Sequence, residues 1–125
     1  MTDIDFKMMV MSAVNKLLEQ GEQSSDVGGT GCKYRSNEGL CCIVGFMMDD
    51  KTAKKGDDLG DASVYYLVRD GLWGEGLTDA QVNQLTTLQG CHDRVNHNAP
   101  FNEEFIEGVN AERDLSWVAE YIGAS

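Results

Sequence analysis

A short stretch of this chain gathers the residue types that carry out most protein chemistry. Three cysteines stand close together, at Cys32, Cys41 and Cys42. The fourth cysteine is followed directly by a histidine and an aspartate, in the order Cys91, His92 and Asp93. Thiol, imidazole and carboxylate groups build both nucleophilic sites and metal sites. The sequence therefore indicates one place for chemistry, although no motif identifies a substrate.

Nucleophilic catalysis is the first interpretation of these residues. A Cys42 thiolate that His92 activates could attack an acyl, amide or glycosidic carbon. Asp93 follows His92 on a predicted helix, where neighbouring side chains point about 100° apart, so it is poorly placed to orient the imidazole. Gln89 and Asn96 share the helical face of His92 and are better placed. If the protein is an enzyme, we expect Cys42, His92 and Gln89 to be catalytic.

A zinc site is the second interpretation. Cys32 and Cys42 would approach from the two sides of a hairpin and His92 from a helix, which suits a tetrahedral site. However, Cys-x9-Cys is not the spacing of a zinc knuckle, and the chain has no Cys-x2-Cys pair. The candidates for a fourth ligand are Cys41, Cys91 and Asp93. Zinc is thus an alternative, and no other cofactor is expected.

A structural role is the third interpretation, and residue preferences favour it. Free cysteine is among the most buried residue types, and a histidine on an apolar helix stripe is commonly a hydrogen-bonded core group. Arg35 could tie the hairpin to the helix by pairing with Asp93. Because Arg35 also suits an anionic group, a pocket for a nucleotide-like ligand stays open. Its residues would be Tyr34, Arg35, His92 and Asp93.

The elements that must position these residues are mostly helical. Apolar residues three and four apart, together with capping signals, predict helices over residues 3–20, 61–70, 78–96, 102–110 and 111–122. Short β-prone segments at 32–35 and 40–44 flank a turn-forming sequence and predict a β-hairpin. Residues 49–60 are predicted to be an exposed loop. The expected fold class is α+β, a mainly helical single domain over residues 1–125 with about five helices and one small β-hairpin.

The charge balance limits the classes of function. The chain carries 21 acidic and 10 basic residues, a formal net charge of −11. This argues against direct nucleic-acid binding, which needs clustered lysine and arginine. No apolar run approaches the roughly 20 residues that span a bilayer, and the first residues lack the basic region of a signal peptide. We therefore expect no membrane association and a cytoplasmic protein with reduced cysteines.

Part of the sequence resembles a known group of proteins. The spacing Cys-x-Tyr-Arg-x3-Gly-x2-Cys-x2-Gly, followed by Leu-Gln-x2-His-Asp, is similar to that of small, functionally uncharacterised proteins from bacteriophages and prophages. The matching residues are Cys32, Tyr34, Arg35, Gly39, Cys42, Gly45, Leu88, Gln89, His92 and Asp93. The resemblance covers about half of the chain and departs from the pattern near residues 57–61, where a shorter segment is expected. It implies a viral origin and supplies no activity.

Acidic residues supply the predicted binding surface. Glu103 and Glu107 share one helical face, and with the acids near residues 57–61 they would form a surface complementary to a basic groove. The partner-binding residues are predicted to be Asp57, Asp58, Asp61, Glu103, Glu104 and Glu107. A viral protein of this charge is expected to bind and inhibit a host protein with a basic surface, or an antiviral defence complex, in the infected cell's cytoplasm. Nucleic-acid mimicry is one route to such inhibition.

Three methionines leave the oligomeric state open. Met8, Met9 and Met11 broaden the apolar face of the first predicted helix. Methionine adapts to irregular contacts, so these side chains suit either the core or a partner surface. An exposed methionine stripe would be the simplest route to a homodimer with two-fold symmetry.

Overall fold

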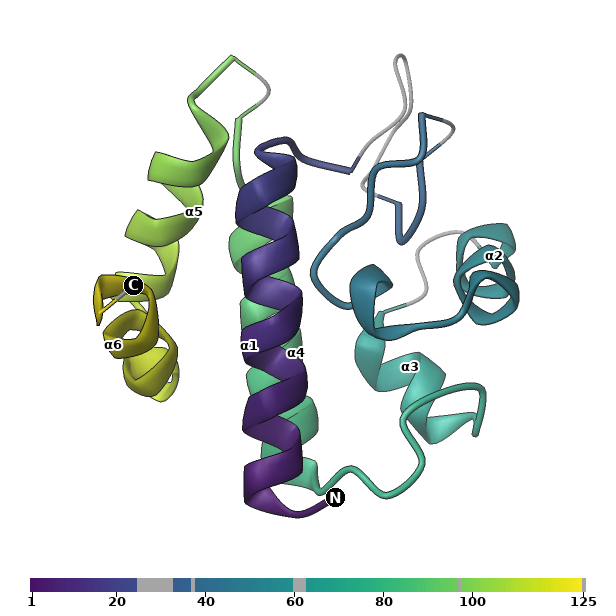
Figure 1. The fold of residues 1–125 in the computed structure, drawn as a ribbon. Helices are drawn as coiled ribbons and strands as arrows, with labels where there is room; N and C mark the ends of the chain where they lie inside the picture. Colours follow the sequence, from purple (N-terminus) through teal and green to yellow (C-terminus); the bar gives the residue numbers. More distant parts are fainter. Residues whose placement is uncertain (25–32, 37, 60–62, 97, 125) are drawn as a thin grey trace.

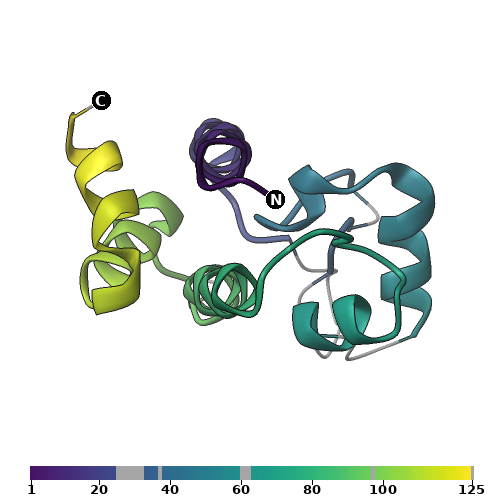
Figure 2. The same ribbon diagram turned by 90° about the horizontal axis from the view of Figure 1, so that it is seen from below.

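Two long helices form the centre of the molecule in the computed structural model (Figure 1). They are α1 (Asp3–Gln20) and α4 (Asp79–Asp93), which run in the same direction and lie beside each other in Figure 2. One side of this pair carries α5 (Phe101–Asn110) and α6 (Ser116–Ala124). The other side carries α2 (Asp50–Asp58) and α3 (Val64–Arg69). The described residues also form two short 3₁₀ helices, η1 (Gly45–Met47) and η2 (Arg113–Leu115).

The structure describes residues 1–24, 33–36, 38–59, 63–96 and 98–124. No helix within these ranges is long and apolar enough to cross a bilayer. One core joins the helices, and its largest fully buried apolar side chains are Phe6, Leu17, Ile43, Leu67, Leu85, Leu88, Phe105 and Leu115.

The helix predicted over residues 3–20 is confirmed as α1. The Thr2 hydroxyl accepts the backbone N–H of Asp5 at 3.1 Å and satisfies a free donor of the first turn. Gly21 ends the helix in a left-handed conformation, with φ of 68°, which glycine adopts without steric cost. The buried stripe consists of Phe6, Val10, Ala13, Val14 and Leu17. These residues are three or four positions apart, so they share the face that packs on the core.

A capping box opens α4, which corresponds to the helix predicted over residues 78–96. The Thr78 and Gln81 side chains each accept the backbone N–H of the other residue, at 3.1 and 3.0 Å. The N-cap position of α5 is taken by Pro100. Asn102 lies inside the helix, and its Nδ2 donates to the Leu18 carbonyl oxygen at 3.0 Å. It therefore ties α5 to the end of α1.

The predicted β-hairpin, and with it the α+β class, is wrong. The described residues contain no β-strand, and only an isolated antiparallel bridge joins Arg35 to Cys41. Side chains take up the backbone groups that a strand ladder would use. The Gln20 amide accepts the Cys41 N–H at 2.9 Å and donates to the Cys41 carbonyl oxygen at 2.8 Å. The Asp57 carboxylate accepts the N–H groups of Tyr34 and Arg35 at 2.8 and 3.0 Å.

The loop predicted over residues 49–60 is wrong as well, because most of it forms α2. Asp49 caps this helix, with its carboxylate accepting the N–H of Thr52 at 2.7 Å. Ala53 and Gly56 are its only buried residues, so no stripe of large apolar residues marks it in the sequence. This is why periodicity missed a sixth α-helix.

Candidate functional site

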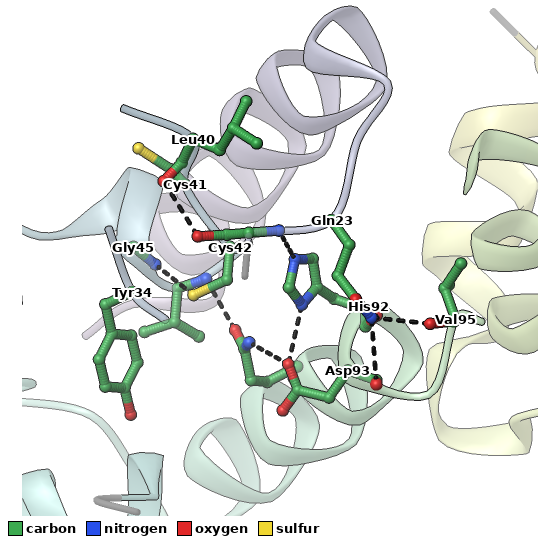
Figure 3. Close-up of polar contacts among 12 residues, drawn as sticks. Gln23, Tyr34, Leu40, Cys41, Cys42, Gly45, His92, Asp93 and Val95 are labelled. Atoms are coloured by element: carbon green, nitrogen blue, oxygen red, sulfur yellow. Dashed lines mark hydrogen bonds and ion pairs between the residues drawn. The ribbon is translucent and has the colours of Figure 1, made fainter. Parts of the chain in front are cut away.

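The cysteine-rich stretch forms a tight turn segment, defined here as residues 33–36 and 38–45. Gly39, with φ of 84°, closes the turn in a conformation that suits glycine. The segment lies beside the carboxyl ends of α1 and α4, as the close-up in Figure 3 shows. Ser24, just after α1, donates its hydroxyl to the Leu40 carbonyl oxygen at 3.0 Å. A side chain from the residues that follow α1 therefore holds the segment by its backbone.

His92 is the centre of the contacts between α4 and the residues after α1. Its side chain is fully buried, and its Nε2 accepts the backbone N–H of Ser24 at 3.0 Å (Figure 3). Because Nε2 accepts, the ring proton is on Nδ1, which donates to the Asp93 carboxylate at 2.8 Å. The ring of Phe101 meets the imidazole edge-on, with centroids 5.6 Å apart. Both ring nitrogens of His92 are thus hydrogen-bonded, and Phe101 packs against the ring.

The hypothesis that Gln89 or Asn96 orients this imidazole is wrong. The carboxylate of Asp93 reaches Nδ1 although it belongs to the next residue along the helix. Gln89 is linked to the imidazole only through Asp93, because its Nε2 donates to the same Asp93 oxygen at 2.9 Å. Its Oε1 accepts the Val44 N–H at 3.1 Å and so ties α4 to the turn segment.

The Cys42 thiol is poorly suited to nucleophilic attack. Its side chain is buried, and its Sγ accepts the Gly45 N–H at 3.3 Å (Figure 3). Burial raises the pKa of the Cys42 thiol well above its ordinary value, and the nearby charge of Asp93 raises it further. The thiol therefore stays protonated, and substrate cannot reach it.

The remaining described cysteines behave in the same way. Cys41 and Cys91 are buried free thiols, and burial raises the pKa of each. No three metal-ligating side chains come together within the described ranges. Cys32 lies outside those ranges, so the predicted zinc set of Cys32, Cys42 and His92 is not tested and remains a prediction.

The alternative ligand pocket around Tyr34 and Arg35 contains groups that are already engaged. The Tyr34 ring packs close to Gly56, where an added Cβ would come within 3.0 Å of the ring, and burial raises the pKa of the Tyr34 hydroxyl. The Arg35 guanidinium donates to the carbonyl oxygens of Gly45 and Met48, at 3.1 and 2.8 Å, and pairs with Asp50. The expected pairing of Arg35 with Asp93 gives way to these contacts.

A hollow of about 500 Å³ beside Arg35 carries balanced charge. Its charged lining residues are Lys33, Arg35, Lys54, Asp50, Asp57 and Asp58. Three cationic and three anionic side chains leave no net preference for either sign, so the hollow offers no dedicated phosphate site.

The structure separates the predicted acidic binding residues. α2 and α5 lie on opposite sides of the α1–α4 pair in both ribbon views (Figures 1 and 2). Asp57 binds the backbone of the turn segment, and Asp58 pairs with Lys54 at 2.9 Å. Asp61 lies outside the described residues. The three glutamates of α5, in contrast, are all exposed: Glu103, Glu104 and Glu107.

A groove of about 320 Å³ lies between α4 and α5 and is called the acidic groove below. Its charged lining residues are Glu104, Glu107, Glu112 and Arg94, and its other lining residues are Cys91, Val95, Gly108 and Ala111. Arg94 approaches Glu112 at 3.5 Å. The predicted binding set did not include Arg94 or Glu112, because their meeting depends on how α4 packs against α5. No sequence signal reports that packing.

Comparison with known protein families, with curated proteins and with solved structures finds no match. The site therefore has to be interpreted from the geometry of this chain. The resemblance to bacteriophage and prophage proteins stays a prediction.

Proposed function

We propose that this protein is a non-enzymatic binding protein that recognises a basic protein segment through α5 and the acidic groove. The observation that carries the proposal is the groove itself, which is concave and acidic. Three carboxylates and one guanidinium line it, which leaves two net negative charges. In addition, α5 contains no lysine or arginine to neutralise its glutamates.

The shape of the groove suits a lysine or arginine side chain. Gly108 and Ala111 form part of the lining and have little or no side chain, so an aliphatic stem can lie along them. Glu104 and Glu107 are one turn apart on α5, where they can flank the cationic head group. Arg94, which follows α4, approaches Glu112 at 3.5 Å within the lining of the groove. Charge complementarity of this kind accelerates association and selects basic partners.

Catalysis is the weaker candidate because its groups are inaccessible. His92 and Cys42 are buried, and their polar atoms are used to hold the fold together. The glutamates of α5, on the other hand, are exposed and available to a partner. In combination with the bacteriophage resemblance, this supports a factor that occupies the basic surface of a host protein and blocks it. Nucleic-acid mimicry would follow if that surface normally binds a polyanion.

A labelled peptide rich in lysine and arginine tests the proposal by fluorescence anisotropy. Reversing the charge of Glu103, Glu104 and Glu107 to lysine should weaken binding at least about tenfold and reduce its salt dependence. A matched control reverses three exposed glutamates elsewhere, Glu22, Glu38 and Glu75, and changes the net charge equally. We expect it to weaken binding less than about threefold.

Equal losses in the two triple variants would mean that the peptide senses only the overall charge, and this would overturn the proposal. Unchanged binding in the α5 variant would overturn it too. Circular dichroism of both variants establishes that the helices are intact, since all six positions are exposed.

A further inference from the structure

The outer face of α1 carries an apolar stripe that the core does not use. Ile4 is 73% exposed and Met8 is 61% exposed, although both are large hydrophobic residues. At 100° per residue, Ile4, Met8, Met11 and Asn15 share one face, and Val10 and Leu17 lie on the opposite, buried face. We call the first four residues the outer stripe; Asn15 is its polar member, and its Oδ1 accepts the Tyr121 hydroxyl of α6 at 2.9 Å. In Figure 2 this helix has α4 on its inner side, and no described element lies beyond it.

The sequence-based question about the three methionines is now answered for each of them. Met9 packs against the core. Met8 and Met11 both belong to the outer stripe, where Met8 is exposed and Met11 is partly exposed. An apolar stripe along a surface helix is a common contact surface between proteins. The occupant has to be identified from the residues that flank the stripe.

We propose that α1 pairs with α1 of a second copy of this chain, in antiparallel orientation about a two-fold axis. The charged residues on either end of one flank of the outer stripe support this antiparallel pairing. Asp5 and Lys16 are exposed, lie on the same flank of the outer stripe and make no ion pair within the described parts of the chain. When two identical helices pack face to face and antiparallel, the same flank of each meets. Asp5 then lies opposite Lys16 of the second copy, and the symmetry makes this pair twice.

The apolar residues fit the same arrangement. An axis that crosses the helix between Met8 and Met11 places Met8 of one copy against Met11 of the other, and Ile4 against Asn15. The axis that would pair Asp5 with Lys16 lies about one residue further along the helix. The two charged side chains are therefore offset by about two residues, or roughly 3 Å, which a lysine side chain spans easily. Parallel pairing would instead bring together the acidic first turns, each with Asp3 and Asp5, and it would align the helix dipoles unfavourably.

The size of the surface sets the expected strength of association. One helix of 18 residues is about 27 Å long, so the contact falls at the small, transient end of protein interfaces. The net charge of −11 on each copy also opposes association. We therefore expect a reversible dimer that forms as concentration rises. It is independent of the acidic groove, which lies between α4 and α5.

Sedimentation velocity across a wide concentration range, at physiological ionic strength, tests this inference on the full chain. The wild-type protein should shift from monomer to dimer, and Met8→Lys should raise the dissociation constant at least about tenfold. Asp5→Lys and Lys16→Asp should each weaken the dimer, since like charges then meet. The double variant should restore it, because the opposite charges meet again. Lys55→Asp, at an exposed site on α2, is the matched control and should have no effect.

A protein that stays monomeric at every concentration would overturn the proposal. So would a dimer that Met8→Lys leaves unchanged, because the outer stripe could not then be its surface. A dimer that the double charge swap fails to restore would overturn the antiparallel register. The α5 triple variant should dimerise normally, so failure of the dimer and failure of the proposed function are distinguishable.

Discussion

The turn segment and the acidic groove both meet α4 near its carboxyl end, and they use polar side chains in opposite ways. His92 is fully buried and bonds to the backbone of Ser24, so it serves the fold. Arg94, only two residues further along, has a side chain that is 63% exposed and lines the groove. Reactive residue types therefore do not by themselves identify a functional site. The solvent accessibility of a side chain decides whether it can serve a partner or substrate. Accessibility changes from buried to exposed between His92 and Arg94, about half a helical turn apart.

The largest expected effect on stability comes from a substitution in the turn segment and tests how tightly that segment is packed. A Cβ added at Gly45 would clash with the backbone carbonyl of Tyr34 and approach Cys42 Sγ at 3.3 Å. Backbone cannot give way as a flexible side chain can, so Gly45→Ala should destabilise the protein by about 3 kcal/mol. Urea unfolding followed by circular dichroism measures this.

Gly123→Ala is the control for this substitution. Gly123 lies in α6, and apart from its chain neighbours and the adjacent backbone of its own helix, no described atom lies within 4 Å of an added Cβ. Alanine favours helix over glycine by up to about 1 kcal/mol, so this variant should be neutral or slightly more stable. Equal stability of the two alanine variants would contradict the tight packing described here.

Local signals in the sequence were sufficient to predict most of the helices. Thr2 and Gly21 mark the ends of α1, and the pair Thr78 and Gln81 marks the start of α4. Such caps depend on residues within one turn, so the sequence displays them directly. The hairpin prediction was wrong because the side chains that hydrogen-bond to this backbone belong to residues far away in the sequence. Gln20 contacts Cys41 from 21 positions away in the sequence, and no local pattern reveals this.

The candidate site was less predictable than the fold. The sequence correctly placed Glu103, Glu104 and Glu107 together on one helix, but it grouped them with Asp57 and Asp58, which belong to α2 on the other side of the α1–α4 pair. Charge and spacing along one helix are local properties. Which helices share a surface depends on tertiary packing, which a single sequence does not display.

The second prediction compares neighbouring carboxylates that the sequence treated alike. Asp57 accepts two backbone N–H groups of the turn segment, and its loss leaves both donors without this partner. Asp57→Ala should therefore cost about 2 kcal/mol. Asp58 makes only an exposed pair with Lys54, four residues earlier on α2, so Asp58→Ala should cost less than about 0.5 kcal/mol. Parallel urea titrations of the two variants measure the difference, and similar losses would contradict the role given to Asp57.

The smallest expected effect separates stability from binding on α5. Glu107→Lys places a cation in the last turn of the helix, where the dipole favours it, and four residues after Glu103, in the favoured order for an ion pair. It should raise stability by about 0.5 kcal/mol and still weaken binding of the basic peptide. Glu103→Lys makes the same charge change in the first turn, where the dipole disfavours a cation, and should lower stability by a similar amount. Thermal melts at low salt, paired with anisotropy titrations, measure both quantities. Opposite shifts in stability with parallel losses of binding would mean that these glutamates serve a partner rather than the fold, whereas unchanged binding in both variants would contradict the acidic groove as the binding site.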